Sequence, residues 1–203
     1  MMRRVVVLLC AAVLTRVVHA DTQCSPTTPI GSQSRTKLKH RVVATTSAQA
    51  TTVAAMVAWA VPNLSNPKVR RANTPIDPRE QLEFTLRGDL WRIKQEGNDC
   101  DFHLEISAPG GSDTDGRVIV EIPREQTAIR DRLIKAVKDS GNGDLTQSPD
   151  KDFAMALPIT VTGYAFIDGT HWTKKSPKKG NKHGTQYVGT LWELHPVLNL
   201  TTK

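Results

Sequence analysis

The stretch Leu82-Glu-Phe-Thr-Leu-Arg-Gly-Asp-Leu-Trp-Arg-Ile93 decides the fold class of this 203-residue chain. Its apolar side chains alternate with polar ones up to Leu86, and the alternation resumes in the opposite phase at Trp91. Alternation of period two is typical of a strand with one buried face. A change of phase at Gly88 is typical of a β-bulge, so we predict one long, bent strand here.

Four more strands and one helix follow in the sequence. Alternating apolar residues predict strands at 100–106, 118–122, 157–166 and 187–200, and apolar residues at helical spacing predict a helix over 124–140. Three strands, one helix and two strands is the order of the OB-fold. We therefore predict an all-β domain with one helix, a small five-stranded OB-like Greek-key barrel, over residues 80–203.

The first twenty residues have the features of a secretory signal peptide. Arg3 and Arg4 precede an apolar run, and small residues occupy the last and third-last positions of Val18-His19-Ala20. The run is too short to span a bilayer comfortably. We predict a signal peptide at 1–20, no transmembrane segment in the mature chain, and a secreted or periplasmic location.

Residues 21–79 form an N-terminal arm and a Pro-rich linker ahead of the barrel. Ser, Thr and Pro are frequent, and the first part shows no apolar period. Within this segment, Val53, Met56 and Val57 recur at helical spacing, which indicates a short helix at 46–60.

Two cysteines remain once the signal peptide is removed. An even pair in an oxidising compartment indicates a disulfide, here between Cys24 and Cys100, with two free thiols as the alternative. In the chain-entropy description of so long a loop, the bond would contribute roughly 4 kcal/mol to stability.

Charge is segregated along the mature chain. The full sequence carries a formal net charge of +7, which falls to +4 without the signal peptide. Residues 80–150 hold 9 basic and 15 acidic side chains, whereas residues 21–79 hold 8 and 2 and residues 151–203 hold 7 and 3. These segments either form complementary surfaces that fold on each other or create a site for a polyanion.

Five motifs carry a resemblance. They are Gly88-Asp-Leu-Trp-Arg92, Asn98-Asp-Cys-Asp-Phe-His-Leu-Glu105, Arg117-Val-Ile-Val-Glu-Ile-Pro123, Val161-Thr-Gly-Tyr-Ala-Phe166 and Trp192-Glu-Leu-His-Pro-Val197. Together they resemble a family of exported bacterial proteins for which no activity is established. The resemblance implies an OB-like fold over about residues 80 to 198, and it brings no catalytic residue.

The densest group of reactive side chains lies in the second predicted strand. Asp101, His103 and Glu105 share one face there, about 7 Å apart. Their types suit Zn²⁺ or Mn²⁺, and the carboxylates alone suit Ca²⁺ or Mg²⁺. The alternative is a solvent-facing strand whose acids pair with neighbouring cations (Arg117, Arg92 or Lys94).

Glu193 and His195 share the outward face of the last predicted strand. In an OB-like barrel that strand runs beside the third, so both residues could approach Arg117 and Glu121. A metal-dependent phosphodiesterase or nuclease would then hold a divalent metal with Asp101 and Glu105. It would use His103 or His195 as the general base and Arg117 to stabilise charge on the phosphate.

The loop at 168–186 is the candidate ligand-binding surface. OB-folds use the loop between their last two strands to bind oligonucleotides and oligosaccharides. Cations beside an aromatic side chain suit a polyanion. Together with Arg117, the candidate binding residues are His171, Trp172, Lys174, Lys175, Lys178, Lys179 and Lys182. The alternative is a solvated loop whose Trp172 packs into the barrel end.

Three functions follow from these patterns. We favour a secreted binding module that recognises a polyanion, such as nucleic acid, or a cell-envelope glycan through the lysine-rich loop 170–183, and that needs no cofactor. The metal-dependent phosphodiesterase is the first alternative, and a structural or protein-interaction module without a small ligand is the second. The sequence favours a monomer and a chain that is not an enzyme.

Overall fold

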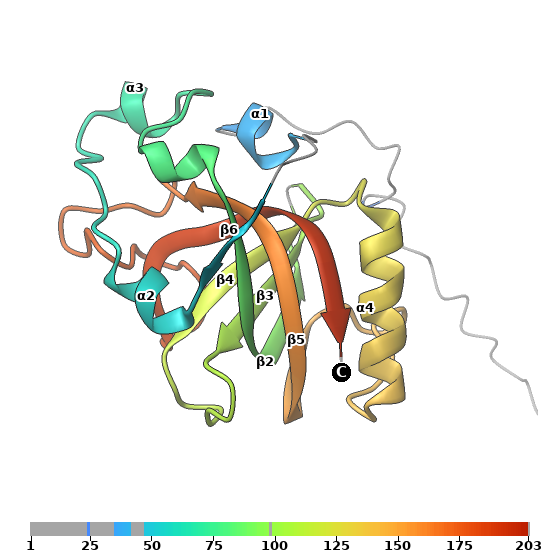
Figure 1. Cartoon of the computed structure of the whole chain (residues 1–203). Coiled ribbons are helices and arrows are strands. Elements are labelled where there is room, and N and C mark those ends of the chain that lie inside the picture. The colour runs from blue at the N-terminus through green and yellow to red at the C-terminus, as the bar shows by residue number, and fades with distance from the viewer. Residues whose placement is uncertain (1–23, 25–34, 42–46, 98, 203) are drawn as a thin grey trace, which may run out of the picture.

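The computed structural model describes residue 24 and residues 35–41, 47–97 and 99–202. The predicted signal peptide, residues 1–20, lies outside this range. Five strands form a closed barrel (Figure 1). They are β2 (Glu83–Gln95), β3 (Phe102–Ser107), β4 (Arg117–Ile122), β5 (Lys151–Ile167) and β6 (Val188–Thr202).

The barrel follows the order β2-β3-β4-β6-β5 and closes through a β2–β5 pairing. β4 and β6 pair in parallel, and the other barrel pairs are antiparallel. Helix α4 (Thr127–Asp139) connects β4 to β5 and buries Ile129, Leu133 and Val137, as its helical spacing predicts. The all-β, OB-like barrel expected from the sequence is therefore confirmed.

The segment before the barrel contains short elements that the sequence only partly indicated. They are α1 (Thr36–Lys39), β1 (Gln49–Thr51), α2 (Val53–Ala58), α3 (Pro67–Arg70) and the 3-10 helix η2 (Pro78–Gln81). The helix expected at 46–60 is confined to α2, because residues 49–51 pair in parallel with β2 instead. Thr52 begins the helix, and its hydroxyl accepts a hydrogen bond from the N–H of Ala55 at 3.0 Å.

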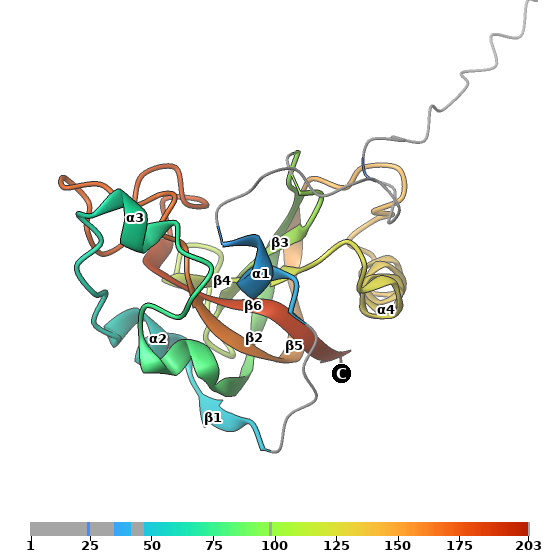
Figure 2. The same cartoon turned by 90° about the horizontal axis from the view of Figure 1, so that it is seen from above.

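The arm and linker pack on the barrel rather than standing apart from it. Met56 of α2 and Leu64 are fully buried in the same apolar cluster as the barrel interior. Helix α1 lies over one end of the barrel, on the side viewed in Figure 2. The N-terminal segment thus completes the core and brings its own polar side chains to that end.

The bulge in β2 lies after Gly88, not at it. Gly88 pairs regularly with Ile159, whereas in the pairing with β3 Leu90 and Arg92 face consecutive residues, Ile106 and Glu105. Trp91 is therefore the bulged residue; it is half-buried, and its Nε1–H donates to Ser107 Oγ at 3.0 Å. Gly88 serves a different purpose, because a Cβ there would lie 2.3 Å from the carbonyl oxygen of Ser107.

No helix among the described residues is long and apolar enough to cross a membrane. Cys24 and Cys100 form a disulfide with a Cα–Cα distance of 5.2 Å across a sequence separation of 76 residues. The predicted pairing of these two cysteines is thus present. It ties the start of the arm to the turn before β3.

Candidate functional site

A cavity of about 370 Å³ opens between α1, the β2–β3 connection and the loop between β5 and β6. Every lining residue except Gly184 has a polar side chain, and the lining includes cations, carboxylates and histidines. The cations are Lys39, Arg92, Lys94 and Lys182, the carboxylates are Glu96, Asp99, Glu105, Glu121 and Asp168, and the histidines are His103, His171 and His183. Ionisable groups gathered in a cavity are a common feature of functional sites.

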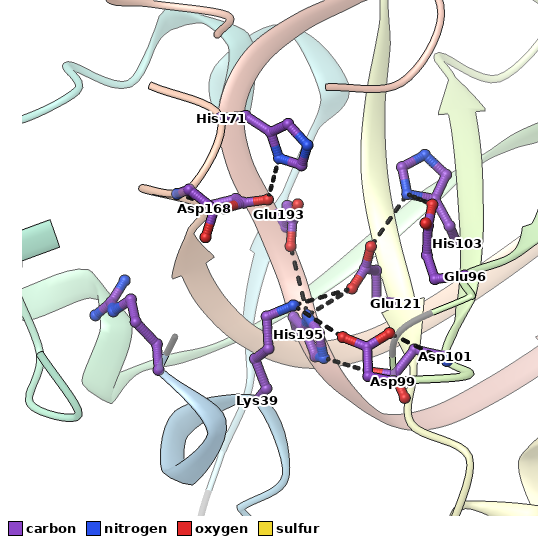
Figure 3. A network of polar contacts seen from close by, with 12 residues as sticks. Lys39, Glu96, Asp99, Asp101, His103, Glu121, Asp168, His171, Glu193 and His195 are labelled. Carbon is purple, nitrogen blue, oxygen red and sulfur yellow. Dashed lines mark hydrogen bonds and ion pairs between the residues drawn. The ribbon is translucent and has the colours of Figure 1, made fainter. Parts of the chain in front are cut away.

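The face of β3 that carries His103 and Glu105 is buried, not solvent-facing as the alternation suggested. Asp101, directly before β3, and Glu105 are fully buried, and His103 is 5% exposed. The loop between β5 and β6 covers this face: the N–H of Thr185 donates to Glu105 Oε1 at 2.7 Å. Helix α1 covers it from the other side, with Lys39 (Figure 3).

The three residues proposed as metal ligands do not converge on one point. Asp101 Oδ2 lies 3.1 Å from Nε2 of His195 on β6. His103 Nε2 lies 3.8 Å from Glu105 Oε1, while its Nδ1 lies 3.0 Å from Glu121 Oε1. Arg117 Nη1 donates to Glu105 Oε2 at 3.2 Å. Each of the two carboxylates is therefore engaged by a different neighbour.

Glu193 and His195, the second predicted cluster, approach Glu121 as expected but not Arg117. Because β4 and β6 are paired, His195 Nδ1 lies 2.9 Å from Glu121 Oε2 and 3.5 Å from Glu193 Oε2. Figure 3 shows His195 between these carboxylates. Arg117 extends to Glu105 instead and stacks its guanidinium 4.9 Å from the ring of Tyr187.

The pKa values of the central groups follow from these contacts. Burial alone would lower the pKa of His103, but its contacts with Glu105 and Glu121 raise it to about 10. Burial alone would raise the pKa of Glu105, but His103 and hydrogen bonds from Thr185 lower it to about 2. His103 and Glu105 therefore face each other as an ion pair at neutral pH.

Lys39 was not anticipated as a site residue. Its Nζ lies 3.3 Å from Asp99 Oδ2 and 4.0 Å from Glu121 Oε2. Burial would lower the pKa of Lys39, but the carboxylates of Glu121, Asp168 and Asp99 outweigh it and raise the pKa. No sequence signal connected α1 with β4, because the contact depends on how the arm folds back.

Asp168, His171 and His183 form a third cluster on the wall of the cavity. Asp168 Oδ2 lies 2.6 Å from Nδ1 of His171 and 3.9 Å from Nε2 of His183. His183 Nε2 also lies 2.7 Å from Glu193 Oε1. Only His171 was predicted as a site residue, although the Asp-x-x-His spacing in a loop could have pointed to Asp168 as its partner.

The lysine-rich loop presents its cations to solvent. Its five lysines are exposed (Lys174, Lys175, Lys178, Lys179 and Lys182), and Lys182 also lines the cavity. Trp172 is half-buried, packs against the core and lies 5.6 Å from the guanidinium of Arg70. This placement agrees with the alternative in which Trp172 packs at the barrel end, so it is not a free stacking surface.

A second hollow of about 370 Å³ adjoins the first and shares Arg92 and Thr185 with it. Three aromatic side chains line it, Trp91, Phe153 and Tyr187, together with charged and polar ones that include Arg117, Asp113 and Asp152. Both hollows are therefore lined by charged side chains of both signs, and the second adds aromatic surface.

Comparisons with known proteins identify no relative. No protein-family model and no curated protein matches this chain. Among solved structures it is similar to "OBody AM3L09 bound to hen egg-white lysozyme", with 14% identity and a TM-score of 0.33, over 61% of this chain and 83% of that one. A likeness of this extent indicates neither family nor function.

Proposed function

We propose that this chain is an exported binding module for an anionic polymer built from ring-containing units. The observation that carries the proposal is the charge of the loop between β5 and β6. Within the described residues, none of its five lysines pairs with a carboxylate, whereas the carboxylates of the cavity are engaged by cations or histidines. The loop therefore has positive charge to offer to a ligand.

The neighbouring hollows supply the other requirements of such a ligand. Lys182 stands at the first hollow, where it could contact phosphate, sulfate or carboxylate groups. Arg92 and Lys94 line the same hollow and are paired with Asp152 and Glu96. The aromatic side chains of the second hollow, Trp91 and Tyr187 among them, offer surfaces for the faces of bases or sugars. Both hollows adjoin the last-loop region that OB-folds use for oligonucleotides and oligosaccharides.

Export is supported by two independent features. The first twenty residues have the pattern of a secretory signal, and Cys24 and Cys100 are joined in a disulfide. Anionic chains outside the cytoplasm include extracellular nucleic acid and acidic glycans, which share spaced negative charges on a backbone of rings.

The test is fluorescence anisotropy of a labelled single-stranded oligonucleotide and of a labelled acidic oligosaccharide, at two salt concentrations and with a chelator present. We expect affinity to fall steeply with salt for one of the two polymers. The Lys178→Ala/Lys179→Ala variant should flatten the salt dependence by about 1.4 logarithmic units of slope if both side chains contact phosphates of a single strand.

The matched control is Lys135→Ala/Lys138→Ala, which removes two exposed lysines from α4, away from the loop (Figure 1). It should bind like the parent chain. Equal loss in the two variants would show general charge attraction, and no binding of either polymer would overturn the proposal in favour of a structural or protein-interaction module.

The metal-dependent phosphodiesterase is a second proposal for the same cavity. The observation that favours it is the His/carboxylate cluster of Asp168, His171 and His183, rather than Asp101, His103 and Glu105. Replacing the chelator with divalent metal in the same titration tests it, because cleavage of a labelled strand lowers the anisotropy with time.

A further inference from the structure

We propose that Asp168, His171 and His183 form a binding site for a divalent transition metal ion of the Zn²⁺ class, open to the cavity. This inference concerns the metal alone and holds whether or not the chain binds a polymer. Two histidines and one carboxylate are a donor set that proteins use for Zn²⁺ and for Fe²⁺, and imidazole nitrogen favours these ions over Ca²⁺ and Mg²⁺.

The distances suit a shared ion. One candidate ligand atom from each residue lies within 4.8 Å of the other two. Zinc bonds of about 2.0 to 2.2 Å in a tetrahedral site place neighbouring ligand atoms about 3.4 Å apart. Asp168 Oδ2 lies 2.6 Å from His171 Nδ1, which is shorter than that value. The 3.9 Å separation from Asp168 Oδ2 to His183 is measured to Nε2, so coordination through Nδ1 of His183 requires a rotation of that side chain.

His183 provides a second, independent observation. Its side chain is 2% exposed, it lines the cavity, and its Nδ1 has no hydrogen-bond partner among the described residues. A buried ring nitrogen without a partner is costly, and a ligand would satisfy it. The other nitrogen, Nε2, is bonded to Glu193 Oε1 at 2.7 Å. An ion bound at Nδ1 would leave the bond from Nε2 to Glu193 intact, as in metal sites where a histidine bonds a carboxylate through its other ring nitrogen.

The loop backbone holds the ligands in place before any ion arrives. The N–H of Asp168 donates to Leu191 O at 3.0 Å, and Asp168 Oδ1 accepts from the N–H of Thr170 at 2.8 Å. The N–H of Asn181 donates to His171 O at 2.8 Å, which ties the two ends of the loop together. A site assembled in this way loses less conformational entropy on binding.

The second His/carboxylate group is a weaker candidate. Asp101, Glu121 and His195 also lie within 4.8 Å of one another, but Asp101 and His195 are fully buried. Both ring nitrogens of His195 already lie within 3.1 Å of carboxylate oxygens. By contrast, the side chain of His171 is 36% exposed and gives an ion a route in from the cavity.

The test is isothermal titration of the intact, chelator-treated and dialysed chain with Zn²⁺, with no polymer present. We expect one ion per chain with a Kd of about 10 µM or tighter. Co²⁺ should give a visible absorption band of the intensity typical of four- or five-coordinate sites. A chain that shows no Zn²⁺ binding below about 1 mM would overturn the proposal.

His171→Gln is the principal variant, because that side chain is partly exposed and its loss should leave the fold intact. We expect it to weaken Zn²⁺ binding by about 10-fold or more. Glu193→Gln should weaken binding by about 10-fold, because Glu193 orients the His183 ring. His40→Gln is the matched control, since His40 belongs to neither cluster. Unchanged affinity in His171→Gln would place the ion elsewhere and overturn the assignment.

Discussion

Two buried polar networks lie at the same end of the barrel, and they differ in how completely they are satisfied. In the first, Arg35 and Glu80 form a double ion pair with distances of 2.7 and 2.8 Å. The Glu80 carboxylate also accepts the N–H groups of Ile76 and Ile167, and Arg35 donates to the carbonyl of Ile167. Neither side chain has a buried polar atom without a partner.

The second network lines the cavity and is incompletely satisfied. Buried atoms without a hydrogen bond among the described residues include His183 Nδ1 and Arg117 Nε. The first network joins α1 and η2 to the end of β5 and has nothing left to offer a ligand. The second keeps unpaired hydrogen-bonding groups beside an accessible hollow. This property distinguishes a ligand-binding site from a purely structural network.

The largest loss of stability is expected when the fully hydrogen-bonded Arg35–Glu80 network is broken. Arg35→Leu would leave the Glu80 charge buried without its partner, so we expect the free energy of unfolding to fall by about 3 to 5 kcal/mol in urea denaturation. Arg87→Leu, which replaces an exposed arginine on β2, serves as the control and should change it by less than about 0.5 kcal/mol. A small effect of Arg35→Leu would mean that the pair does not hold the arm to the barrel.

A smaller change in the free energy of unfolding is expected when pH changes the charge of the network that lines the cavity. The pKa of His103 is raised from 6.5 to about 10, so its contribution is complete below pH 6.5 and is lost as pH rises toward 10. The pKa of Glu105 is lowered from 4.5 to about 2, so its contribution is complete above pH 4.5 and is lost as pH falls toward 2. Stability should therefore be greatest between about pH 4.5 and 6.5.

Urea midpoints measured across this range give the check. Between pH 6.5 and 8, the His103 contribution alone should decline by roughly 2 kcal/mol. The carboxylates that face His103 come from three elements: Glu96 after β2, Glu105 on β3 and Glu121 on β4. His103→Gln should reduce the alkaline decline, and a flat profile from pH 5 to 9 would contradict the ion pairing described for this network.

The smallest effect is expected at an exposed ion pair. Lys135 pairs with Asp139 on the surface of α4, with both side chains more than half exposed. We expect Lys135→Ala to lower the free energy of unfolding by less than about 0.5 kcal/mol, because solvent screens such pairs. A loss comparable to that of Arg35→Leu would show that burial is not what separates the two kinds of ion pair.

Periodicity predicted the strands and α4 correctly because apolar side chains on one face must meet the core. It misplaced the bulge in β2, since Gly88 suggests where a strand can bend, whereas the pairing with β3 decides that Trp91 is the extra residue. It also offered a solvent-facing strand as the alternative for His103 and Glu105, because polar residues in alternation usually face water, but both side chains are buried. The cover over that face comes from segments far away in the sequence.

The sequence by itself determined the barrel, the segregation of charge and the pairing of the two cysteines, because these depend on residue type and local spacing. Only the tertiary structure decided which ionisable groups meet. It brought Lys39 from the arm to Glu121 on β4, and His183 from the loop to Glu193 on β6. The physical reason is that a buried charge selects its partner by distance in space, which short-range sequence patterns do not encode.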